Sequence, residues 1–392
     1  MRKSISILGS TGSVGVSTLS IIDKKKNYFK VHLLSANKNF YLIEKQIKKY
    51  KPKIFVITNK EIYEKIKKKF SKNKIIISNT FNELTITKKN DITISAIPGI
   101  VGLEPTIQMV KSSKKILIAN KESIICGWHL IKKTALQYNT KIIPIDSEHF
   151  SILKLLENHS LKEIKKIYIT ASGGPFLNYK KNQLKNIKIK DALNHPKWKM
   201  GKKITIDSST LMNKILELIE AQKIFNIPNK KLDILIHPNS LVHAIIEMKN
   251  GLIKFLYHDT TMIIPLANAI FDGKININDF FKKKKKIKVI EDLYFKKVDS
   301  NIFPVIKLKD RLDEYPSTPI IINATNEVLV DQFLKKKIPF LGIYKIIMDI
   351  LKDSNYRKYA IKKANTINKI LSIDNWARNI TKEHVKQNTF YN

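Results

Sequence analysis

SISILGSTGSVG, residues 4–15, is an apolar strand that runs directly into a glycine-rich turn, and a helical pattern follows it. This order is typical of nucleotide-binding α/β folds, because glycines let the backbone approach a pyrophosphate at the N-terminus of a helix. The spacing of Gly9, Gly12 and Gly15 differs from the dinucleotide pattern G-x-G-x-x-G. A glycine-rich connection without a ligand is therefore the alternative interpretation.

The alternation of strands and helices continues to residue 145. Apolar runs predict strands at residues 30–34, 53–57, 74–77, 91–96, 115–119 and 141–145. Helical periodicity predicts helices at about residues 39–50, 60–70, 102–112 and 127–138. Repeated β–α units favour a mostly parallel sheet. We therefore expect an α/β protein whose N-terminal domain, residues 1–149, is a Rossmann-like doubly wound sheet that binds a dinucleotide.

The turn after the second predicted strand bears on the choice of cofactor. NAD-specific sites usually have an acidic residue about 20 residues past the glycines, where it binds a ribose hydroxyl. This chain has Asn37, Lys38 and Asn39 there. A lysine suits a 2′-phosphate, so we predict NADPH rather than NADH. The alternative is that Lys38 is one more surface lysine.

Two carboxylates, Asp146 and Glu148, follow the last predicted strand in IIPIDSEHFSILKLL, residues 142–156. The carboxyl end of a strand is where open α/β sheets bind ligands, and in an extended chain residues two apart point to the same face. Carboxylates this close raise each other's pKa unless a cation lies between them. We expect a hard divalent ion, Mg²⁺ or Mn²⁺, and a polar loop is the alternative.

The pattern changes over residues 150–275, where we expect a central α+β catalytic domain. The turn Ser172-Gly173-Gly174 offers a hydroxyl and backbone N–H groups to a phosphate, or it is simply a tight turn. Residues 191–207 contain His195, Trp198 and Met200 in a cationic loop, which predicts a mobile lid over a ligand. A tryptophan packed as an apolar anchor is the alternative.

Residues 207–221, DSSTLMNKILELIEA, predict a helix that Ser208 or Ser209 could cap. Asn213 and Glu217 lie four residues apart and therefore share one face of it. Glu217 could complete a three-carboxylate site with the two acids of residues 146–148. Residues poised to bind a phosphate would be Ser208, Asn213 and Lys214. Exposed glutamates are common on helices, which is the alternative for Glu217.

The remaining chain predicts a linker and a helical domain. Residues 276–310 contain a run of lysines at positions 282–286 and read as a linker with a solvated charge. From residue 317 onward, apolar periodicity predicts helices at residues 320–334, 340–351, 356–371 and 375–386. We expect a small C-terminal helical domain over residues 311–392, without a catalytic group of its own.

Composition narrows the class of protein. The formal charge is +39, but almost all of the excess is lysine, and only four residues are arginine. Because arginine is the favoured residue for phosphate and base recognition, we interpret the charge as a lysine-rich surface and expect no nucleic-acid partner. The chain has one cysteine, no apolar run long enough for a membrane span and no signal-peptide pattern at its start. We expect a cytoplasmic protein that does not enter a membrane.

Taken together, these motifs resemble the 1-deoxy-D-xylulose 5-phosphate reductoisomerase family over nearly the whole chain. The resemblance rests on eight motifs in order: GSTGSVG (9–15), ANKES (119–123), DSEH (146–149), SGGPF (172–176), HPKWKMGKK (195–203), DSSTLMNKILE (207–217), IHPNSLVHA (236–244) and NATNE (323–327). The family implies rearrangement and NADPH-dependent reduction of 1-deoxy-D-xylulose 5-phosphate to 2-C-methyl-D-erythritol 4-phosphate, in isoprenoid synthesis by the non-mevalonate route. It also implies a homodimer.

The resemblance implies a role for each matching residue. The residues matched to metal ligands are Asp146, Glu148 and Glu217. Those matched to NADPH contacts are Thr11, Gly12, Ser13, Val14, Asn37, Lys38, Asn39, Asn120, Glu122 and Gly201. Those matched to the sugar-phosphate substrate and its lid are Lys121, Ser147, Glu148, Ser172, His195, Trp198, Met200, Ser208, Asn213, Lys214 and Glu217. As catalytic residues we expect Lys121, His195 and the three carboxylates.

The chain departs from the family at two positions. Asn37 and Ile215 stand where many members have glycine. The first bears on NADPH contacts and the second on packing inside a helix. Two other functions are weighed against this one. An NADP-dependent dehydrogenase without rearrangement would need no metal, and a nucleic-acid-binding protein would show a steep dependence of affinity on salt.

Overall fold

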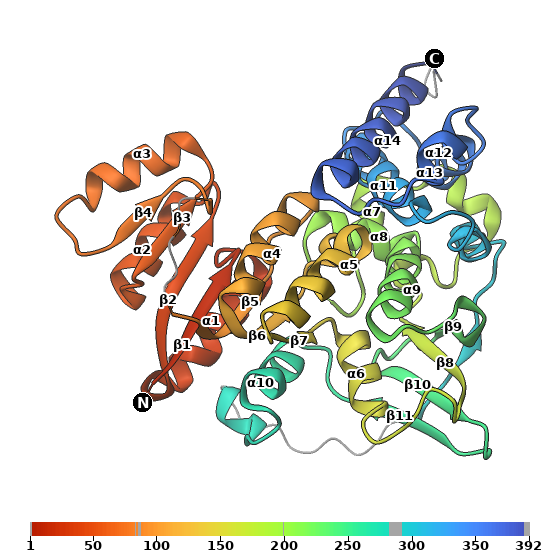
Figure 1. Ribbon diagram of the computed structural model, residues 1–392. Helices are drawn as coiled ribbons and strands as arrows, with labels where there is room; N and C mark the ends of the chain where they lie inside the picture. The colour runs from red at the N-terminus through yellow and green to blue at the C-terminus, as the bar shows by residue number, and fades with distance from the viewer. Residues whose placement is uncertain (1, 83, 85–87, 199, 282–291, 388–392) are drawn as a thin grey trace. The chain divides into compact units, whose positions relative to one another are not determined.

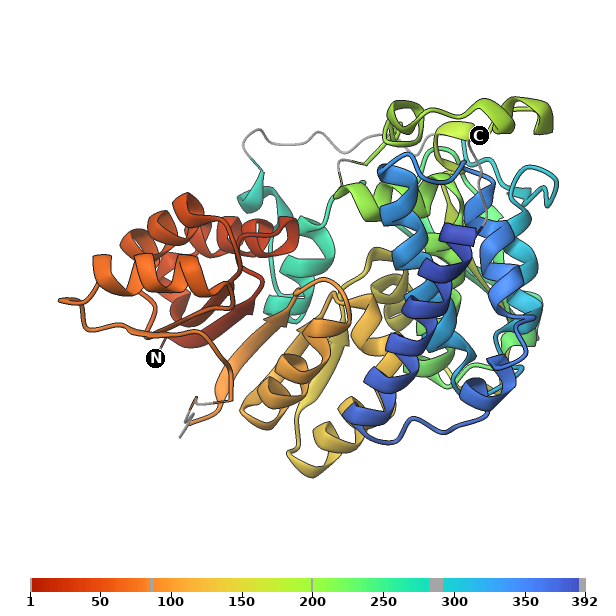
Figure 2. The same cartoon turned by 90° about the horizontal axis from the view of Figure 1, so that it is seen from above.

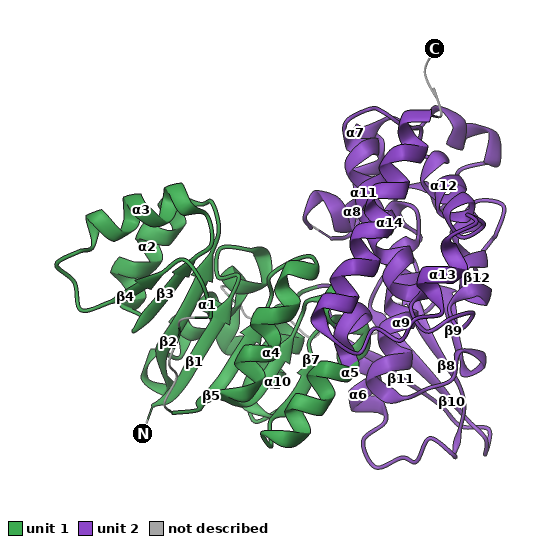
Figure 3. Ribbon diagram, turned by 45° about the horizontal axis from the view of Figure 1, so that its top comes forward, with its two compact units in different colours: residues 1–123, 129–150, 261–290 green, residues 124–128, 151–260, 291–392 purple. Residues whose placement is uncertain are grey.

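The computed structural model describes residues 2–82, 84, 88–198, 200–281 and 292–387 (Figure 1). The chain forms two compact units, coloured separately in Figure 3. Unit 1 comprises residues 1–123, 129–150 and 261–290, and unit 2 comprises residues 124–128, 151–260 and 291–392. The predicted lysine run at 282–286 lies outside the described residues. No helix in the described ranges has the length and apolarity that a membrane span requires.

Unit 1 is built on a parallel sheet of seven strands in the order β4-β3-β2-β1-β5-β6-β7. The strands are β1 (Lys3–Leu8), β2 (Phe29–Ala36), β3 (Ile54–Ile57), β4 (Ile76–Ser78), β5 (Asn90–Ser95), β6 (Ser113–Ile118) and β7 (Lys141–Pro144). The strand order reverses between β1 and β5, which is the arrangement of a doubly wound fold. The predicted sheet is confirmed, and its central strands are apolar because helices cover both faces (Figures 1 and 2).

In the described part of the first 155 residues, an α-helix follows each strand except β4. They are α1 (Ser13–Lys24), α2 (Phe40–Tyr50), α3 (Lys60–Lys69), α4 (Leu103–Lys111), α5 (Lys121–Gln137) and α6 (Ser147–Leu155). Short 3₁₀ helices, η1 (Lys26–Tyr28) and η2 (Ile100–Gly102), precede β2 and α4. Side chains of Asn39, Asn59 and Asn120 accept backbone N–H groups at the starts of α2, α3 and α5. These caps explain why the three helices begin where they do.

Helix α10 (Ile263–Phe271) belongs to unit 1 although it comes late in the chain, and η6 (Ile277–Phe280) follows it. α10 packs against α1, and Lys115 on β6 closes its C-terminal end. The ammonium of Lys115 donates to the carbonyl of Ala269 at 2.8 Å and pairs with Asp272 at 3.0 Å. Burial lowers the pKa of Lys115. Because carbonyls in the last turn of a helix lack partners within it, this lysine anchors α10 to the sheet.

Unit 2 contains a mixed sheet of five strands in the order β11-β10-β8-β9-β12. The strands are β8 (Ile164–Ala171), β9 (Leu232–Ile236), β10 (Val242–Met248), β11 (Ile253–Tyr257) and β12 (Lys296–Lys297). Only β8 and β9 are parallel, and the other neighbours are antiparallel. The carboxyl ends of β8 and β9 therefore lie at one edge, where the SGG turn and the HPNS segment begin.

Helices make up the rest of unit 2. They are α7 (Ile189–Ala192), α8 (Lys202–Ser209), α9 (Met212–Phe225), α11 (Thr318–Leu334), α12 (Gly342–Ile350), α13 (Tyr356–Ala360) and α14 (Ile367–Gln387). The 3₁₀ helices are η3 (Gly174–Phe176), η4 (Lys181–Asn186), η5 (Asn229–Lys231) and η7 (Pro304–Arg311). α11 packs against α8, α12 and α14. The predicted C-terminal helices are confirmed, but the break falls at residues 361–366 rather than near residue 373.

Two predicted helices have different boundaries in the structure. The helix predicted at 127–138 is the second part of α5, which begins at Lys121 after the cap Asn120 and is kinked at Gly127, with φ −130° and ψ 17°. The helix predicted over 207–221 is two helices, with Ser208 and Ser209 at the end of α8 rather than at a helix start. The interruption is at Leu211, whose φ of 67° is left-handed. Leucine gives no sign of such a break, because that conformation favours glycine and asparagine.

Candidate functional site

The glycine turn joins β1 to α1 by close backbone packing. The backbone N–H of Ser10 donates to the carbonyl of Ser35 at 2.8 Å, and the N–H of Gly9 donates to the Ser35 hydroxyl at 3.0 Å. Gly9 has a φ of 82°, and a Cβ there would lie 2.6 Å from the carbonyl oxygen of Ala96. α1 begins at Ser13 with its first N–H groups uncapped by any side chain. Such an N-terminus suits an anionic ligand.

Gly15→Ala should destabilise the protein, whereas Gly12→Ala should not. A Cβ on Gly15 would lie 2.6 Å from the Cα of Ser10, and backbone cannot yield there. A Cβ on Gly12 meets only the carbonyl oxygen of Gly9, at an ordinary 3.4 Å. We expect Gly15→Ala to lower the free energy of unfolding by about 2–3 kcal/mol, measured by urea denaturation without cofactor. Equal stability of the two variants would contradict this.

The three residues that were predicted to bind the ribose end of NADPH follow β2. Asn37, Lys38 and Asn39 are exposed, and the Asn39 side chain caps α2 by accepting the N–H of Leu42 at 3.1 Å. Gln46 on α2 was not predicted. It is 4% exposed, accepts the Ser10 hydroxyl at 2.6 Å and donates to the carbonyl of Ser10 at 2.9 Å. The sequence does give one indication of this contact, because Gln46 is a neutral polar residue at a position where a lysine-rich helix otherwise has apolar side chains.

The ANKES segment, residues 119–123, follows β6. The side-chain amide of Asn120 forms hydrogen bonds through both its nitrogen and its oxygen. Asn120 is 3% exposed. Its side chain caps α5 at Ser123 and donates to the carbonyls of Ile97 and Gly99 and to the carboxylate of Glu122. Asn120 therefore holds the loop after β5 against the start of α5. Lys121 follows it as the first residue of α5.

Asp146 lies between a lysine and a histidine at the end of β7. The ammonium of Lys121 lies 2.5 Å from Oδ2 of Asp146, and Nδ1 of His149 lies 3.2 Å from Oδ1. The exposed fractions of the side chains are 11% for Lys121, 18% for Asp146 and 0% for His149. Asp146 is therefore a partly buried carboxylate that is paired with the ammonium of Lys121.

The prediction that Asp146 and Glu148 converge along an extended chain is wrong. The chain is not extended there, because Ser147 and Glu148 are the first residues of α6. Asp146 instead accepts the backbone N–H of Glu148 at 3.2 Å, and the Ser147 hydroxyl donates to the carboxylate of Glu148. The two acids converge because a tight helix start folds them together.

Glu217 is almost fully buried on α9, with a relative exposure of 1%. Oε1 accepts the amide of Asn213, and Oε2 accepts the ammonium of Lys214 at 2.6 Å. The predicted face shared by Asn213 and Glu217 is confirmed, and Lys214 lies beside it with a relative exposure of 7%. A buried carboxylate of this kind needs charged or hydrogen-bonding partners, and all three side chains come from the first two turns of one helix.

Among the described residues, Asp146, Glu148 and Glu217 form a group that could hold a metal ion. One carboxylate oxygen from each residue lies within 4.8 Å of those from the other two. Three carboxylate oxygens are the donor type that Mg²⁺ and Mn²⁺ prefer. The donor set therefore fits a hard divalent cation.

Ser172 and His195 form a second polar pair. The Ser172 hydroxyl lies 3.2 Å from Nε2 of His195 and also accepts the N–H of Gly174 at 3.1 Å. Nδ1 of His195 accepts the backbone N–H groups of Lys197 and Trp198 at 3.1 and 2.9 Å. Because Nδ1 accepts, the neutral ring carries its proton on Nε2 and donates it to the Ser172 hydroxyl. Burial, together with the cation of Lys214, lowers the pKa of His195 to about 4.

This shift should make stability depend on pH through His195. The unfolded chain takes up a proton at His195 as the pH falls below its ordinary pKa of 6.5, whereas the folded protein does so only near 4. Stability should therefore fall as the pH falls from 6.5 to 4. His195→Asn should lose less stability over this window, measured by urea unfolding between pH 7 and 4.5, with His159→Asn as the control. A difference between His195→Asn and wild type that is independent of pH would contradict the assignment.

The lid segment follows His195, and part of it is helical. Residues from Lys202 onward belong to α8, so the non-helical part of the predicted loop ends at Gly201. Trp198 is half-buried, and its ring meets His243 edge-on at 6.3 Å. His243 in turn stacks on His258 at 3.9 Å. The histidine pair was not predicted as a support for Trp198, because β10 and the loop after β11 are distant in sequence from the lid.

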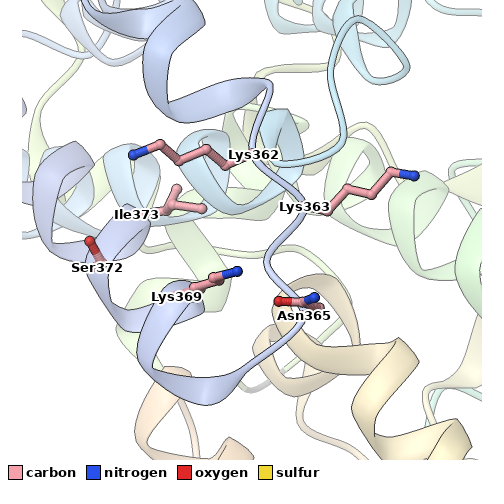
Figure 4. Close-up of a pocket in the computed structure, with 6 residues that line it drawn as sticks. All are labelled: Lys362, Lys363, Asn365, Lys369, Ser372 and Ile373. Carbon is pink, nitrogen blue, oxygen red and sulfur yellow. The ribbon is translucent and has the colours of Figure 1, made fainter.

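A separate pocket in the C-terminal helices does not have the features of a catalytic site (Figure 4). It has a volume of about 500 Å³, and Lys362, Lys363 and Lys369 contribute its charge. Figure 4 shows the ammonium groups of Lys362 and Lys363 pointing in opposite directions, so they do not converge on one ligand.

Comparisons with known proteins agree on one family. A family model described as 1-deoxy-D-xylulose 5-phosphate reductoisomerase matches residues 5–127. A model of the C-terminal domain of that enzyme matches residues 142–225, and a model described as DXP reductoisomerase C-terminal domain matches residues 259–380. The three matches together span most of the chain.

Individual relatives match over nearly their whole length. The 1-deoxy-D-xylulose 5-phosphate reductoisomerase of Pelagibacter ubique is 44% identical over 380 residues, which cover 95% of this chain and 97% of the relative. The enzyme of Clostridium acetobutylicum is 38% identical over 376 residues, covering 93% and 95%. A crystal structure of DOX-P reductoisomerase with NADPH, fosmidomycin and magnesium has a TM-score of 0.88 and 31% identity, with 98% of each chain covered. The Zymomonas mobilis enzyme with NADPH has a TM-score of 0.85 and 29% identity, covering 98% of this chain and 99% of that one.

Proposed function

This chain belongs to the 1-deoxy-D-xylulose 5-phosphate reductoisomerase family, and we propose the roles that its own residues play in that family's reaction. It is a metal-dependent NADP oxidoreductase that converts 1-deoxy-D-xylulose 5-phosphate to 2-C-methyl-D-erythritol 4-phosphate in isoprenoid synthesis. NADPH is its cofactor, and a divalent ion is required.

The metal would be held by Asp146, Glu148 and Glu217. The observation that carries this assignment is the approach of their three carboxylate oxygens to within 4.8 Å of one another. Mg²⁺ fits the donor set, and Mn²⁺ fits it equally. When bound, the ion supplies Lewis acidity toward the carbonyl and hydroxyl oxygens of the substrate. Nδ1 of His149 lies beside this ligand, 3.2 Å from Oδ1 of Asp146.

NADPH would bind along the carboxyl edge of the parallel sheet in unit 1. Its pyrophosphate would lie at the N-terminus of α1, against residues Thr11, Gly12, Ser13 and Val14. Its 2′-phosphate would lie against Asn37, Lys38 and Asn39, where the exposed ammonium of Lys38 favours a phosphate over a ribose hydroxyl. The nicotinamide end would lie near Asn120, Glu122 and Gly201. Asn120 would act mainly by positioning, since its amide is already engaged within the protein.

The substrate's phosphate would be bound by side chains of unit 2. The residues are Ser172, Ser208, Asn213 and Lys214, with Ser147 near the metal end of the substrate. Support comes from the tight packing of the Ser172 loop on α8, because a Cβ on Gly174 would lie 3.0 Å from the carbonyl of Ser208. His195 holds Ser172 through Nε2. Trp198 and Met200 would close over the substrate and exclude water.

Lys121, His195 and the three carboxylates would each have a separate role in the reaction. The ammonium of Lys121 is held 2.5 Å from Asp146, where it can stabilise negative charge on substrate oxygens during the rearrangement. The Ser172 hydroxyl accepts hydrogen bonds from the neutral His195 ring and from the N–H of Gly174, which leaves its proton to be donated to the phosphate. The carboxylates would orient both fragments of the substrate so that they recombine in one geometry.

A direct assay tests the proposed function. Purified protein is incubated with 1-deoxy-D-xylulose 5-phosphate, Mg²⁺ and either NADPH or NADH, and the nicotinamide absorbance is followed. We expect turnover that requires the metal, and a kcat/KM with NADPH at least about tenfold above that with NADH. A branched carbon skeleton in the product separates this reaction from that of a simple dehydrogenase. Turnover without metal, or a preference for NADH, would contradict the assignment.

The chain would act as a homodimer that pairs through β11. This strand lies at the edge of its sheet, and Ile253 and Phe255 on one face are 65% and 44% exposed. An exposed apolar edge strand tends to pair with another strand. In a homodimer that strand would be β11 of a second copy of the chain. We expect Phe255→Lys to be largely monomeric in sedimentation velocity experiments, whereas Leu136→Lys, at an exposed position on α5, should remain dimeric. A dimeric Phe255→Lys variant would exclude this interface.

The domain limits and the compartment are also proposals. We propose an NADPH-binding domain over residues 1–149, a catalytic domain over 150–275, a linker over 276–310 and a helical domain over 311–392. The compact units divide the chain differently at one point, because residues 261–275, with α10, group with unit 1. A single buried cysteine, Cys126, fits a reducing cytoplasm.

A further inference from the structure

A buried hydrogen bond joins helix α8 to helix α11. Oδ1 of Asp207 accepts the side-chain amide of Asn326 at 2.7 Å, and Oδ2 lies 3.1 Å from the ammonium of Lys203. Asp207 is 1% exposed and Asn326 is 0% exposed. Burying a charge is costly unless it is hydrogen-bonded or paired. The bond to Asn326 therefore fixes the last turn of α8 against α11.

That last turn carries Ser208 and packs closely against the backbone at Gly174. A Cβ on Gly174 would lie 3.0 Å from the carbonyl oxygen of Ser208 and 3.2 Å from the Cα of Ser209. The loop on the other side of this contact presents Ser172 to His195. A small displacement of α8 would therefore change the distance between Ser172 and Ser208.

The corner that follows Ser208 is strained. Leu211 is 2% exposed and has a φ of 67°, which is unfavourable for a residue with a large side chain. Such a conformation persists only where its surroundings hold it. α9 begins at the next residue and presents Asn213 and Lys214. The positions of these side chains thus depend on how firmly α8 is held.

The side chain of Asn326 is favourable for the hydrogen bond to Asp207 and unfavourable for the stability of α11. Its Oδ1 has no hydrogen-bond partner among the described residues. Asparagine is a weaker helix former than leucine, and a buried carbonyl without a partner is unfavourable. Both features would favour an apolar residue at this position if packing alone mattered. α11 is itself fixed to α14, because Arg378 pairs with Glu327 and lies 2.5 Å from Asp374.

We propose that Asn326 is a positioning residue for phosphate recognition. Through Asp207 it holds the end of α8, and with it Ser208 and the start of α9, at the spacing that the phosphate requires. This inference rests on the proposed function, since it assigns the phosphate to Ser172, Ser208, Asn213 and Lys214. It gives the NATNE segment, residues 323–327, a role in substrate binding without contact to the substrate.

Three variants test the proposal. Asn326→Leu removes the donor and keeps the size. Asn323→Leu is the matched control, because Asn323 is equally buried on α11 and, among the described residues, its amide donates only within that helix, to Glu327 at 3.4 Å. The double variant Asp207→Asn/Asn326→Asp restores the bond with donor and acceptor exchanged. The measurements are kcat, KM for 1-deoxy-D-xylulose 5-phosphate, the inhibition constant of inorganic phosphate, the Kd of NADPH and the Tm.

For Asn326→Leu we expect KM and the inhibition constant of phosphate to rise about tenfold, with kcat changed less than about threefold and the Kd of NADPH unchanged. The control should match wild type in both constants, and the double variant should return them to within about threefold of wild type.

Unchanged constants in Asn326→Leu, with only a lower Tm, would overturn the proposal. If Asn326→Leu does not fold, the single variant Asn326→Asp takes its place, because it sets two carboxylates against each other. Failure of the double variant to rescue that defect would also overturn the proposal. A wild-type protein that does not turn over the substrate would instead refute the proposed function.

Discussion

Glu217→Gln is expected to lower kcat/KM for 1-deoxy-D-xylulose 5-phosphate about a thousandfold or more, because it removes the charge of a proposed metal ligand from a site that depends on Lewis acidity. The amide keeps the size and shape of the side chain, so packing on α9 should survive, but its single oxygen accepts from only one of the donors Asn213 and Lys214. The affinity for Mn²⁺ should fall about 10–100-fold or more. NADPH binding should be almost intact, since the glycine turn belongs to unit 1.

Calorimetric titration with Mn²⁺ and fluorescence titration with NADPH separate these effects. Glu220→Gln is the matched control, because Glu220 lies on the same helix and is also 1% exposed. It should keep its affinity for Mn²⁺. Normal activity of Glu217→Gln at saturating Mg²⁺ would exclude a ligand role for Glu217 and with it the proposed metal site.

Lys121→Met should lower kcat by about a hundredfold to a thousandfold, because a preorganised cation that stabilises developing negative charge contributes roughly that much. Its effect on the metal should differ from that of Glu217→Gln. The ammonium lies 2.5 Å from Asp146, so its removal frees that carboxylate. The Kd for Mn²⁺ should therefore not rise.

Lys132→Met on the exposed face of α5 controls for the loss of a lysine from this helix, and it should match wild type in kcat. Single-turnover measurements of NADPH oxidation distinguish slow chemistry from slow product release. A Lys121→Met variant with wild-type kcat, or one whose only defect is weak metal binding, would remove Lys121 from the chemical step.

Short sequence patterns predicted the features that depend on interactions between residues close together in the chain. The turn at Gly9 and the alternating strands follow from backbone freedom and apolar periodicity, and the order of seven parallel strands agrees with them. The site residues on α9 were placed on one face because helical spacing alone brings Asn213 and Glu217 together. Their approach to Asp146 came from the family resemblance, since nothing within residues 207–221 specifies it.

The errors arose where a short polar segment can adopt more than one structure. DSEH was interpreted as an extended segment, although an aspartate followed two residues later by a glutamate also indicates a capped helix start. The break at Leu211 has no sequence signal, because its conformation is imposed by contacts of α8 and α9. Pairings such as Asp207 with Asn326 span 119 residues, and periodicity carries no information at that range.

The anchoring of α10 by Lys115 has a consequence for synthesis of the protein on the ribosome. The last helix of the nucleotide-binding unit is translated only after the strands β8 to β11 of the other unit. Until residues 269–272 emerge, the ammonium of Lys115 lacks its three partners, Ala269, Ile270 and Asp272. The N-terminal sheet is therefore synthesised without the helix α10 that packs on it. The ribosome adds more than a hundred residues between β7 and α10 before that helix is made. Nascent chains stalled before α10 should accordingly be more sensitive to proteases within residues 1–150 than chains released after it.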